Sequence, residues 1–174
     1  MKVTFRPATL HDAERITYIY NQAVRNKCCC DTETVTVLER MPWIRSHIGK
    51  EHYPLYVGEV SDPLGESYPE VIGYGYLTEY RFGRPAVSGT AEVSYFLDFK
   101  YHRMGLGTKF LSFLEDEARR LGFDTLIAIL MSSNDASIGL LRKSGYELWG
   151  SMPDCVRIGD LITDHIYYGK KISG

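Results

Sequence analysis

The segment His102-Arg103-Met104-Gly105-Leu106-Gly107-Thr108 has residues suited to binding a phosphate group. It lies between an expected strand and an expected helix, where glycines let the backbone turn tightly and bring its N–H groups close to a ligand. The first turn of a helix adds unpaired N–H donors and the positive end of the helix dipole. An ordinary tight turn would also use a Gly-x-Gly pair, so these residues alone leave both interpretations open.

Two common phosphate-binding signatures are missing from this segment. The dinucleotide fingerprint Gly-x-Gly-x-x-Gly would need its third glycine at Phe110. The chain also has no Gly-x-x-x-x-Gly-Lys-Ser/Thr loop for a nucleoside triphosphate. A phosphate ligand of this turn is therefore expected to belong to another class.

Cysteine and acidic side chains are the other candidates for chemistry. Three of the four cysteines are consecutive, and no pair of Cys-x-x-Cys motifs is present: Cys28, Cys29, Cys30 and Cys155. This spacing indicates neither a disulfide framework nor a zinc site. Two interpretations remain: ordinary reduced thiols, or a cluster that lines a pocket or senses redox state. Asp160, Asp164 and His165 suggest a metal, but a solvated strand face is favoured, so no metal is expected.

Composition limits the class of protein. The 174 residues are 44% hydrophobic and 24% charged, as in an ordinary globular domain, and we expect one domain over residues 1–174. The net charge of -2 does not indicate the basic surface that a nucleic-acid-binding protein needs. No window approaches the roughly 20 apolar residues of a membrane span, and the first residues lack the apolar core of a secretory signal. We therefore expect a cytoplasmic protein that binds neither nucleic acid nor a membrane.

Hydrophobic periodicity predicts alternating strands and helices. Strands are expected at 3–6, 55–60, 71–77, 90–98, 124–130, 146–150 and 161–171, with a turn-rich hairpin loop at 61–70. Helices are expected after Thr9 and Thr36, whose partners three residues later form capping boxes, and over 106–121 and 133–145. The second helix should carry Leu38, Met41, Ile44 and Ile48, with Pro42 early in the helix. The right-handed crossover in the second half should pair two strands in parallel, within a mixed α/β sheet covered by helices.

Longer segments carry a family resemblance. The run EVSYFLDFKYHRMGLGTKFLSFLEDEARRLGF resembles the coenzyme A-binding core of the GNAT N-acetyltransferase superfamily, and SNDASIGLLRKSGYE resembles its next motif. With FRPATLHDAERITYIYNQAV, LYVGEV, VIGYGYL and RPA, the pattern is similar to the phosphinothricin N-acetyltransferase subfamily over nearly the whole chain. The resemblance implies the GNAT fold, an α/β fold whose mixed, mostly antiparallel sheet has a central parallel splayed strand pair and is flanked by helices.

Acetyl-coenzyme A (acetyl-CoA) is the co-substrate that the resemblance implies, with no metal. Three strand residues would present backbone groups to its pantetheine arm and thioester: Tyr95, Phe96 and Leu97. The glycine turn would surround the pyrophosphate with Arg103, Met104, Gly105, Leu106, Gly107 and Thr108. Asn134 would contact the coenzyme near the splayed strands.

The resemblance also implies the acceptor side of the site. Glu92, ten residues before His102, matches the subfamily's catalytic glutamate and would remove a proton from the amine directly or through water. Arg84 in RPA matches a substrate-side arginine whose planar fork suits a carboxylate or phosphinate. The expected reaction is acetyl transfer to the amine of a small amino-acid-like substrate such as phosphinothricin, methionine sulfoximine or methionine sulfone. Subfamily members often form homodimers.

Three positions depart from the subfamily pattern. His102 replaces the first Gln or Arg of the glycine motif, and Cys28 to Cys30 replace residues near the substrate. Leu141 stands where a tyrosine or histidine often protonates the leaving thiolate, although a thiol with a pKa near 8.5 can leave as the thiolate without a dedicated acid. These departures leave open a coenzyme A-binding module without transfer activity, or an acetyltransferase for a polyamine or a protein N-terminus.

Overall fold

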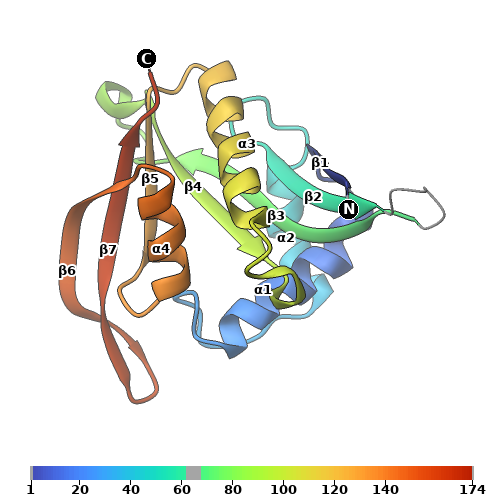
Figure 1. Cartoon of the computed structure of the whole chain (residues 1–174), viewed down its shortest axis with the longest axis horizontal. Coiled ribbons are helices and arrows are strands. Elements are labelled where there is room, and N and C mark those ends of the chain that lie inside the picture. The colour runs from blue at the N-terminus through green and yellow to red at the C-terminus, as the bar shows by residue number, and fades with distance from the viewer. Residues whose placement is uncertain (1, 62–67, 174) are drawn as a thin grey trace.

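One seven-stranded sheet is covered by helices on both faces in the computed structural model, which describes residues 2–61 and 68–173 (Figure 1). The strands are β1 (Lys2–Pro7), β2 (Leu55–Ser61), β3 (Glu70–Glu79), β4 (Thr90–Leu97), β5 (Thr125–Met131), β6 (Glu147–Ile158) and β7 (Leu161–Lys171). The helices are α1 (Ala13–Arg25), α2 (Val37–His47), α3 (Leu106–Arg120) and α4 (Asp135–Lys143). This order of elements confirms the sequence prediction, but most of the loop predicted at 61–70 lies outside the described residues.

The sheet has the order β1-β2-β3-β4-β5-β7-β6. Only β4 and β5 pair in parallel among the described strands, and α3 connects them. This pair is the product of the predicted crossover, and the other pairs are antiparallel. The last hairpin is longer than predicted, because β6 continues beyond residue 150 through two irregularities in its register with β7.

The parallel pair is short. Its register consists of Thr90 with Thr125, Ala91 with Leu126, and Glu92 with Ile127. Beyond Glu92 the two strands separate, while β4 keeps its pairing with β3 as far as Leu97. The predicted splay is therefore present, and it leaves one edge of β4 unpaired in the middle of the sheet.

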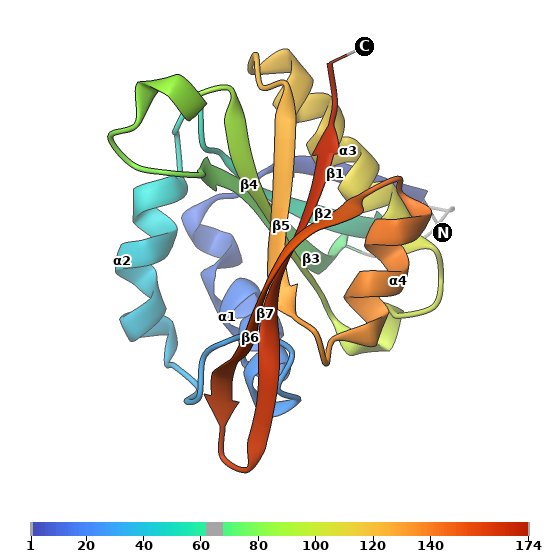
Figure 2. The same ribbon diagram turned by 90° about the vertical axis from the view of Figure 1, so that its left-hand side faces the viewer.

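Two apolar layers hold the helices against the sheet, with α1 and α2 on one face and α3 and α4 on the other (Figure 2). Phe110 and Leu114 of α3 pack in the layer that also contains Leu141 of α4. Ile16 and Ile19 of α1 pack in the opposite layer with Ile44 of α2. The ligand site thus has to open at an edge or at the splay rather than through either core.

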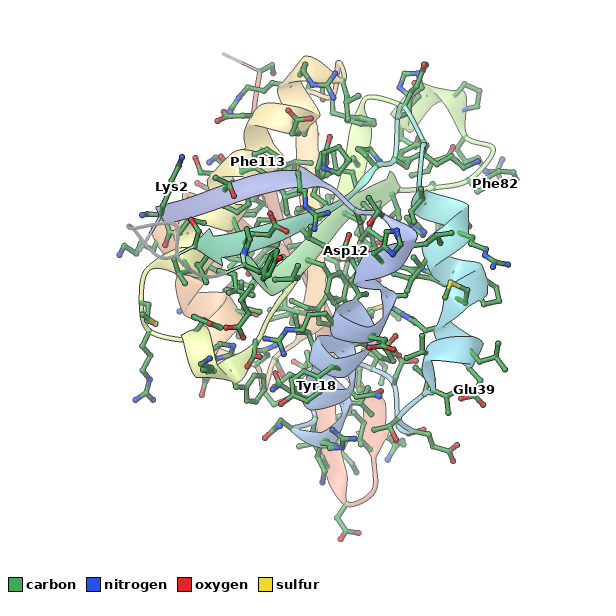
Figure 3. All side chains as sticks on the ribbon, turned by 90° about the vertical axis from the view of Figure 1, so that its right-hand side faces the viewer. Lys2, Asp12, Tyr18, Glu39, Phe82 and Phe113 are labelled. Carbon is green, nitrogen blue, oxygen red and sulfur yellow. The ribbon has the colours of Figure 1, made fainter. Side chains whose placement is uncertain are left out.

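The capping predictions explain where α1 and α2 begin. The Asp12 carboxylate accepts hydrogen bonds from the Thr9 N–H at 2.7 Å and the Thr9 hydroxyl at 3.0 Å, just before α1 (Asp12 is labelled in Figure 3). The Thr36 N–H and hydroxyl donate to Glu39 in the same way. Both boxes satisfy N–H groups that a helix start would otherwise leave unpaired.

One of the apolar residues expected on α2, Leu38, does not face the core. Leu38 is 82% exposed, whereas Ile44 is buried and Met41 and Ile48 pack against the same layer. Arg40 and His47 are half-buried on the same side of the helix. Pro42 is the sixth residue of α2 rather than an early one. The helix starts at Val37, so the 3.6-residue period brings Arg40 to the same side as Ile44 and turns Leu38 outward.

None of the described helices is long and apolar enough to cross a membrane.

Candidate active site

The glycine turn leads from the end of β4 into α3. Gly105 immediately precedes α3 with a φ of 74°, in the left-handed region that glycine adopts without steric cost. Arg103 also has a positive φ, 63°. The turn is exposed, with Met104 52% accessible, so the unpaired N–H groups at the start of α3 face a region that a ligand can reach.

Gly107 lets the start of α3 approach its neighbours closely. A Cβ at this position would lie 2.9 Å from a methyl group of Leu140 and 3.3 Å from one of Leu97. The second glycine of the motif therefore allows α3, α4 and β4 to meet at the turn. The first glycine of the motif sets the backbone direction, and the second allows close packing.

The open edge of β4 offers further backbone groups. The Asp98 N–H donates to the Ile72 carbonyl on β3 at 2.8 Å, and alternate residues of a strand point their N–H and C=O groups to opposite edges. Tyr95 and Leu97 therefore direct theirs toward the β5 side, beyond the last parallel pair. Phe96 directs its backbone toward β3, while its ring stacks on Tyr74 at 4.9 Å.

His102 and Asn134 border this edge. The His102 ring nitrogen Nε2 lies 3.1 Å from the Leu97 carbonyl oxygen. The Asn134 Oδ1 atom accepts from the Ser137 N–H and caps α4, and its Nδ2 atom donates to the Cys28 carbonyl at 3.2 Å. Asn134 therefore fastens the segment between α1 and α2 to the start of α4.

Glu92 lies at the point where β4 and β5 separate. It is opposite Thr78 of β3 and Ile127 of β5, so the three side chains share one face of the sheet. Phe96, four residues along β4, shares that face and packs against Tyr20 of α1. Burial raises the pKa of Glu92 above the ordinary value of a glutamate, which makes its carboxylate a stronger base.

Arg84 lies apart from this group, in the connection between β3 and β4. The connection is exposed, and Phe82 projects outward from it with 93% of its surface accessible (Figure 3). Two backbone hydrogen bonds shape the turn around Arg84, from its N–H to Arg81 and from Val87 to its carbonyl. Among the described residues, no hydrogen bond or ion pair joins the side chains of Arg84 and Glu92, and Arg84 is exposed at the rim.

Arg40 of α2 lies on the same side of the sheet as Glu92, and it is a charged residue that the sequence pattern did not single out. Its guanidinium lies between the rings of Tyr20 and Trp43, with its central carbon 3.9 Å from each ring centroid. Trp43 also contacts Tyr76, the neighbour of Glu92 on the same face, at 5.0 Å between centroids. The helical period places Arg40 four residues before Ile44, which was the signal available in the sequence.

The cysteines lie beside the same face but carry no sign of activation. All four are free. Burial raises the pKa of Cys29 to about 11 and also raises the pKa values of Cys28 and Cys30. These thiols are protonated at neutral pH, which opposes a nucleophilic role. Within residues 2–61 and 68–173, no group of three His, Cys, Asp or Glu side chains is placed to hold a metal ion.

The backbone groups around the splay fit acetyl-CoA. The pantetheine arm of the coenzyme carries amides, which the unpaired edge at Tyr95 and Leu97 can bind as a neighbouring strand would. The pyrophosphate can bind at the start of α3, where unpaired N–H groups and the helix dipole converge. A thioester held by these groups would reach the separation of β4 and β5, where Glu92 lies.

Comparison with known proteins agrees with this geometry. The profile described as "Acetyltransferase (GNAT) domain" matches residues 5–167. YwnH of Bacillus subtilis is 32% identical over 172 residues, which cover 98% of this chain and all of YwnH. The L-methionine sulfoximine/L-methionine sulfone acetyltransferase of Pseudomonas aeruginosa is 35% identical over 156 residues, 88% of this chain and 85% of that protein.

A solved structure extends the comparison to three dimensions. The GNAT superfamily phosphinothricin acetyltransferase of Sinorhizobium meliloti, in complex with acetyl-CoA, superposes with a TM-score of 0.85 at 28% identity. The match covers 98% of this chain and 89% of the other. The resemblance deduced from the sequence and the expected fold are therefore confirmed. The chain belongs to the GNAT superfamily and is an acetyl-CoA-dependent N-acetyltransferase related to the phosphinothricin acetyltransferases.

Proposed function

We propose that this enzyme acetylates the amine of a small amino-acid-like substrate of the phosphinothricin, methionine sulfoximine or methionine sulfone type. The observation that carries the proposal is the position of Glu92 where β4 and β5 separate, on the face opposite α3 and α4. The relatives named above, with activity on the same compounds, support the choice of acceptor.

Glu92 is the proposed catalytic base. A substrate ammonium has to lose a proton before its nitrogen can attack the thioester carbonyl. Burial raises the pKa of Glu92, so its carboxylate takes that proton more readily than an exposed glutamate would. No described residue competes by hydrogen bonding to this carboxylate, since burial is the only cause that shifts its pKa.

Backbone donors at the open edge of β4 stabilise the reaction's developing charge in this proposal. The N–H of Leu97 points to the β5 side and can donate to the oxyanion formed when the amine attacks. The thiol of coenzyme A leaves as the thiolate without a proton donor on α4, because Leu141 is apolar and 1% exposed. N–H groups from Arg103 to Thr108 bind the pyrophosphate in this proposal, and Asn134, which caps α4, contacts the coenzyme near the splayed strands.

Arg84 is proposed to bind the acid group of the acceptor from the exposed rim. Arg81, in the same connection, offers a matched control because it is equally exposed. Arg84→Gln should raise the KM for phosphinothricin by about tenfold, the effect of losing a hydrogen bond to a charged group, and Arg81→Gln should not. Equal effects of the two changes would remove Arg84 from the binding site.

The test is detection of acetylated product by mass after incubation with acetyl-CoA. The acceptors are phosphinothricin, methionine sulfoximine, methionine sulfone, ordinary amino acids, spermidine and peptides. Glu92→Gln should lower kcat by about 10²- to 10⁴-fold and leave acetyl-CoA binding unchanged, whereas the exposed Glu147→Gln should change neither. If only spermidine or peptides give product, the acceptor is a polyamine or a peptide and not a small amino-acid-like amine. Saturable acetyl-CoA binding without any product would favour a binding module.

A homodimer in the cytoplasm completes the proposal. Large apolar side chains are exposed on the last hairpin: Leu148, Trp149, Met152 and Ile162. Such a cluster is typical of a surface that another protein covers. Light scattering at micromolar concentration should give a mass near twice the 19.8 kDa of the chain, and a monomer would contradict the proposal.

A further inference from the structure

Arg40 is a cation that aromatic rings hold in the α1–α2 layer. Its guanidinium is sandwiched between Tyr20 of α1 and Trp43 of α2, with 3.9 Å from its central carbon to each ring centroid. Glu39, the preceding residue, bonds back to Thr36 at the start of α2 and points away from the sheet (Figure 3). Cation–π contact with the two rings fixes the position of the guanidinium.

One donor of this cation has no hydrogen-bond partner in the described part of the protein. The Arg40 Nε atom is buried without a hydrogen-bond partner, and so is the Tyr74 hydroxyl. Arg40 takes part in none of the ion pairs of residues 2–61 and 68–173. A buried donor without an acceptor costs about 1–3 kcal/mol, and more when it is charged. An arriving oxyanion would recover this cost.

Tyr76 connects Arg40 to the proposed base. Tyr76 lies opposite Ser94 on β4, one residue pair from Thr78 and Glu92, and its ring meets Trp43 edge to face. Burial is the main cause that raises the pKa of Tyr76; the charge of Arg40 opposes the rise and the charge of Glu92 adds to it. Arg40 and Glu92 therefore both lie within electrostatic reach of one hydroxyl on one face of the sheet.

An amino acid presents an amine and an oxyanion at a short, fixed separation. We propose that Arg40 binds an oxyanion of the acceptor, with the Tyr74 hydroxyl as a second donor, while Glu92 faces the amine. The inference rests on the proposed function. The oxyanion is a carboxylate or a phosphinate, both of which match the two parallel donors of a guanidinium. Arg40 is a specificity-determining residue in this arrangement, deeper in the fold than the exposed Arg84.

The test compares three acceptors that differ in their oxyanions. Phosphinothricin has a carboxylate and a phosphinate, methionine sulfone has only the carboxylate, and the carboxamide of methionine sulfone has neither. KM and kcat are measured for the wild type, Arg40→Gln and Arg40→Lys. Arg45→Gln on the same helix is the matched control, since Arg45 is exposed. Thermal unfolding and acetyl-CoA binding report whether each variant is folded.

The proposal expects Arg40→Gln to raise KM for the charged acceptors by about 10- to 100-fold, with little effect on the carboxamide. An effect on both acids identifies the carboxylate, and an effect on phosphinothricin alone identifies the phosphinate. Arg40→Lys keeps the charge and should recover part of the loss, and it serves as the test if Arg40→Gln does not fold. A loss of the same size for all three acceptors, or no loss, would overturn the assignment.

A binding measurement separates this inference from the proposed function. Calorimetric titration of methionine sulfone into the enzyme without acetyl-CoA requires no turnover. Binding by the wild type that weakens at least tenfold in Arg40→Gln supports the oxyanion site even if the product assay fails. Equal binding by both proteins refutes the site even if the enzyme acetylates methionine sulfone.

Discussion

Substitution of Gly105 by alanine should weaken acetyl-CoA binding more than it weakens the fold. Gly105 has a φ of 74°, and a Cβ built there meets no described atom within 4 Å. The cost to stability is therefore the conformational cost of a left-handed alanine, about 1–2 kcal/mol, without any steric clash. For a chain of this length, each kcal/mol lowers Tm by about 2–4 °C, so Gly105→Ala should lower Tm by roughly 2–8 °C.

Gly159 provides a matched control. It has a φ of 59° in the turn between β6 and β7, and a Cβ there also meets nothing within 4 Å. Gly159→Ala should therefore lower Tm by a similar amount. The two sites differ in what faces them, because only Gly105 precedes α3, where the N–H groups proposed to bind the pyrophosphate begin.

Calorimetry with acetyl-CoA distinguishes the two roles. Gly105→Ala should raise Kd on the order of tenfold, since the new methyl group and the strained turn disturb hydrogen bonds to a charged ligand. Gly159→Ala should leave Kd within about twofold of the wild type, as expected for a distant site. If both variants bind acetyl-CoA like the wild type while both lose stability, the turn is only a structural connection and the phosphate assignment is wrong.

Three further outcomes follow from the structure. Because burial raises the pKa of Glu92, kcat/KM should rise with pH through a value above the pKa of an ordinary glutamate. The free energy of unfolding should fall as the pH rises from the ordinary glutamate pKa to the raised one. Glu92→Gln should remove this pH dependence of stability, as measured by denaturant unfolding at several pH values. Asn134→Ala removes the cap of α4 and the bond to Cys28, so it should cost about 1–2 kcal/mol in the same assay. Ile44→Ala should cost about 2–5 kcal/mol and the exposed Leu38→Ala less than about 0.5, whereas the reverse order would contradict the orientation of α2.

Local patterns predicted most elements because the physics that sets them is local. Thr9 with Asp12 and Thr36 with Glu39 satisfy helix N–H groups within four residues, so both helix starts could be placed from the sequence. The helical spacing of the apolar residues in α3 likewise predicts its single buried side. The extension of β6 was missed because its later residues are mostly exposed and pair irregularly with β7, which leaves no alternation to detect.

The two halves of the candidate site differ in how far a sequence can reveal them. On the coenzyme side the groups that bind are N–H groups of the backbone, which glycines such as Gly105 and Gly107 position through their own conformation and size. The coenzyme side of the candidate site can therefore be recognised in the sequence as a short motif.

On the acceptor side the groups are side chains brought together by packing between distant elements. Arg40 comes from α2, whose Trp43 packs against Tyr76 of β3, and strand pairing places Tyr76 one residue pair from Glu92. Arg40 and Leu38 are separated by about 200° around the helix, so the phase of α2 decides which of them faces the sheet. The sequence pattern did not show that Leu38 faces outward. Under the proposed function, small shifts of α2 would therefore change the acceptor, while the glycine turn proposed to bind the coenzyme would stay the same.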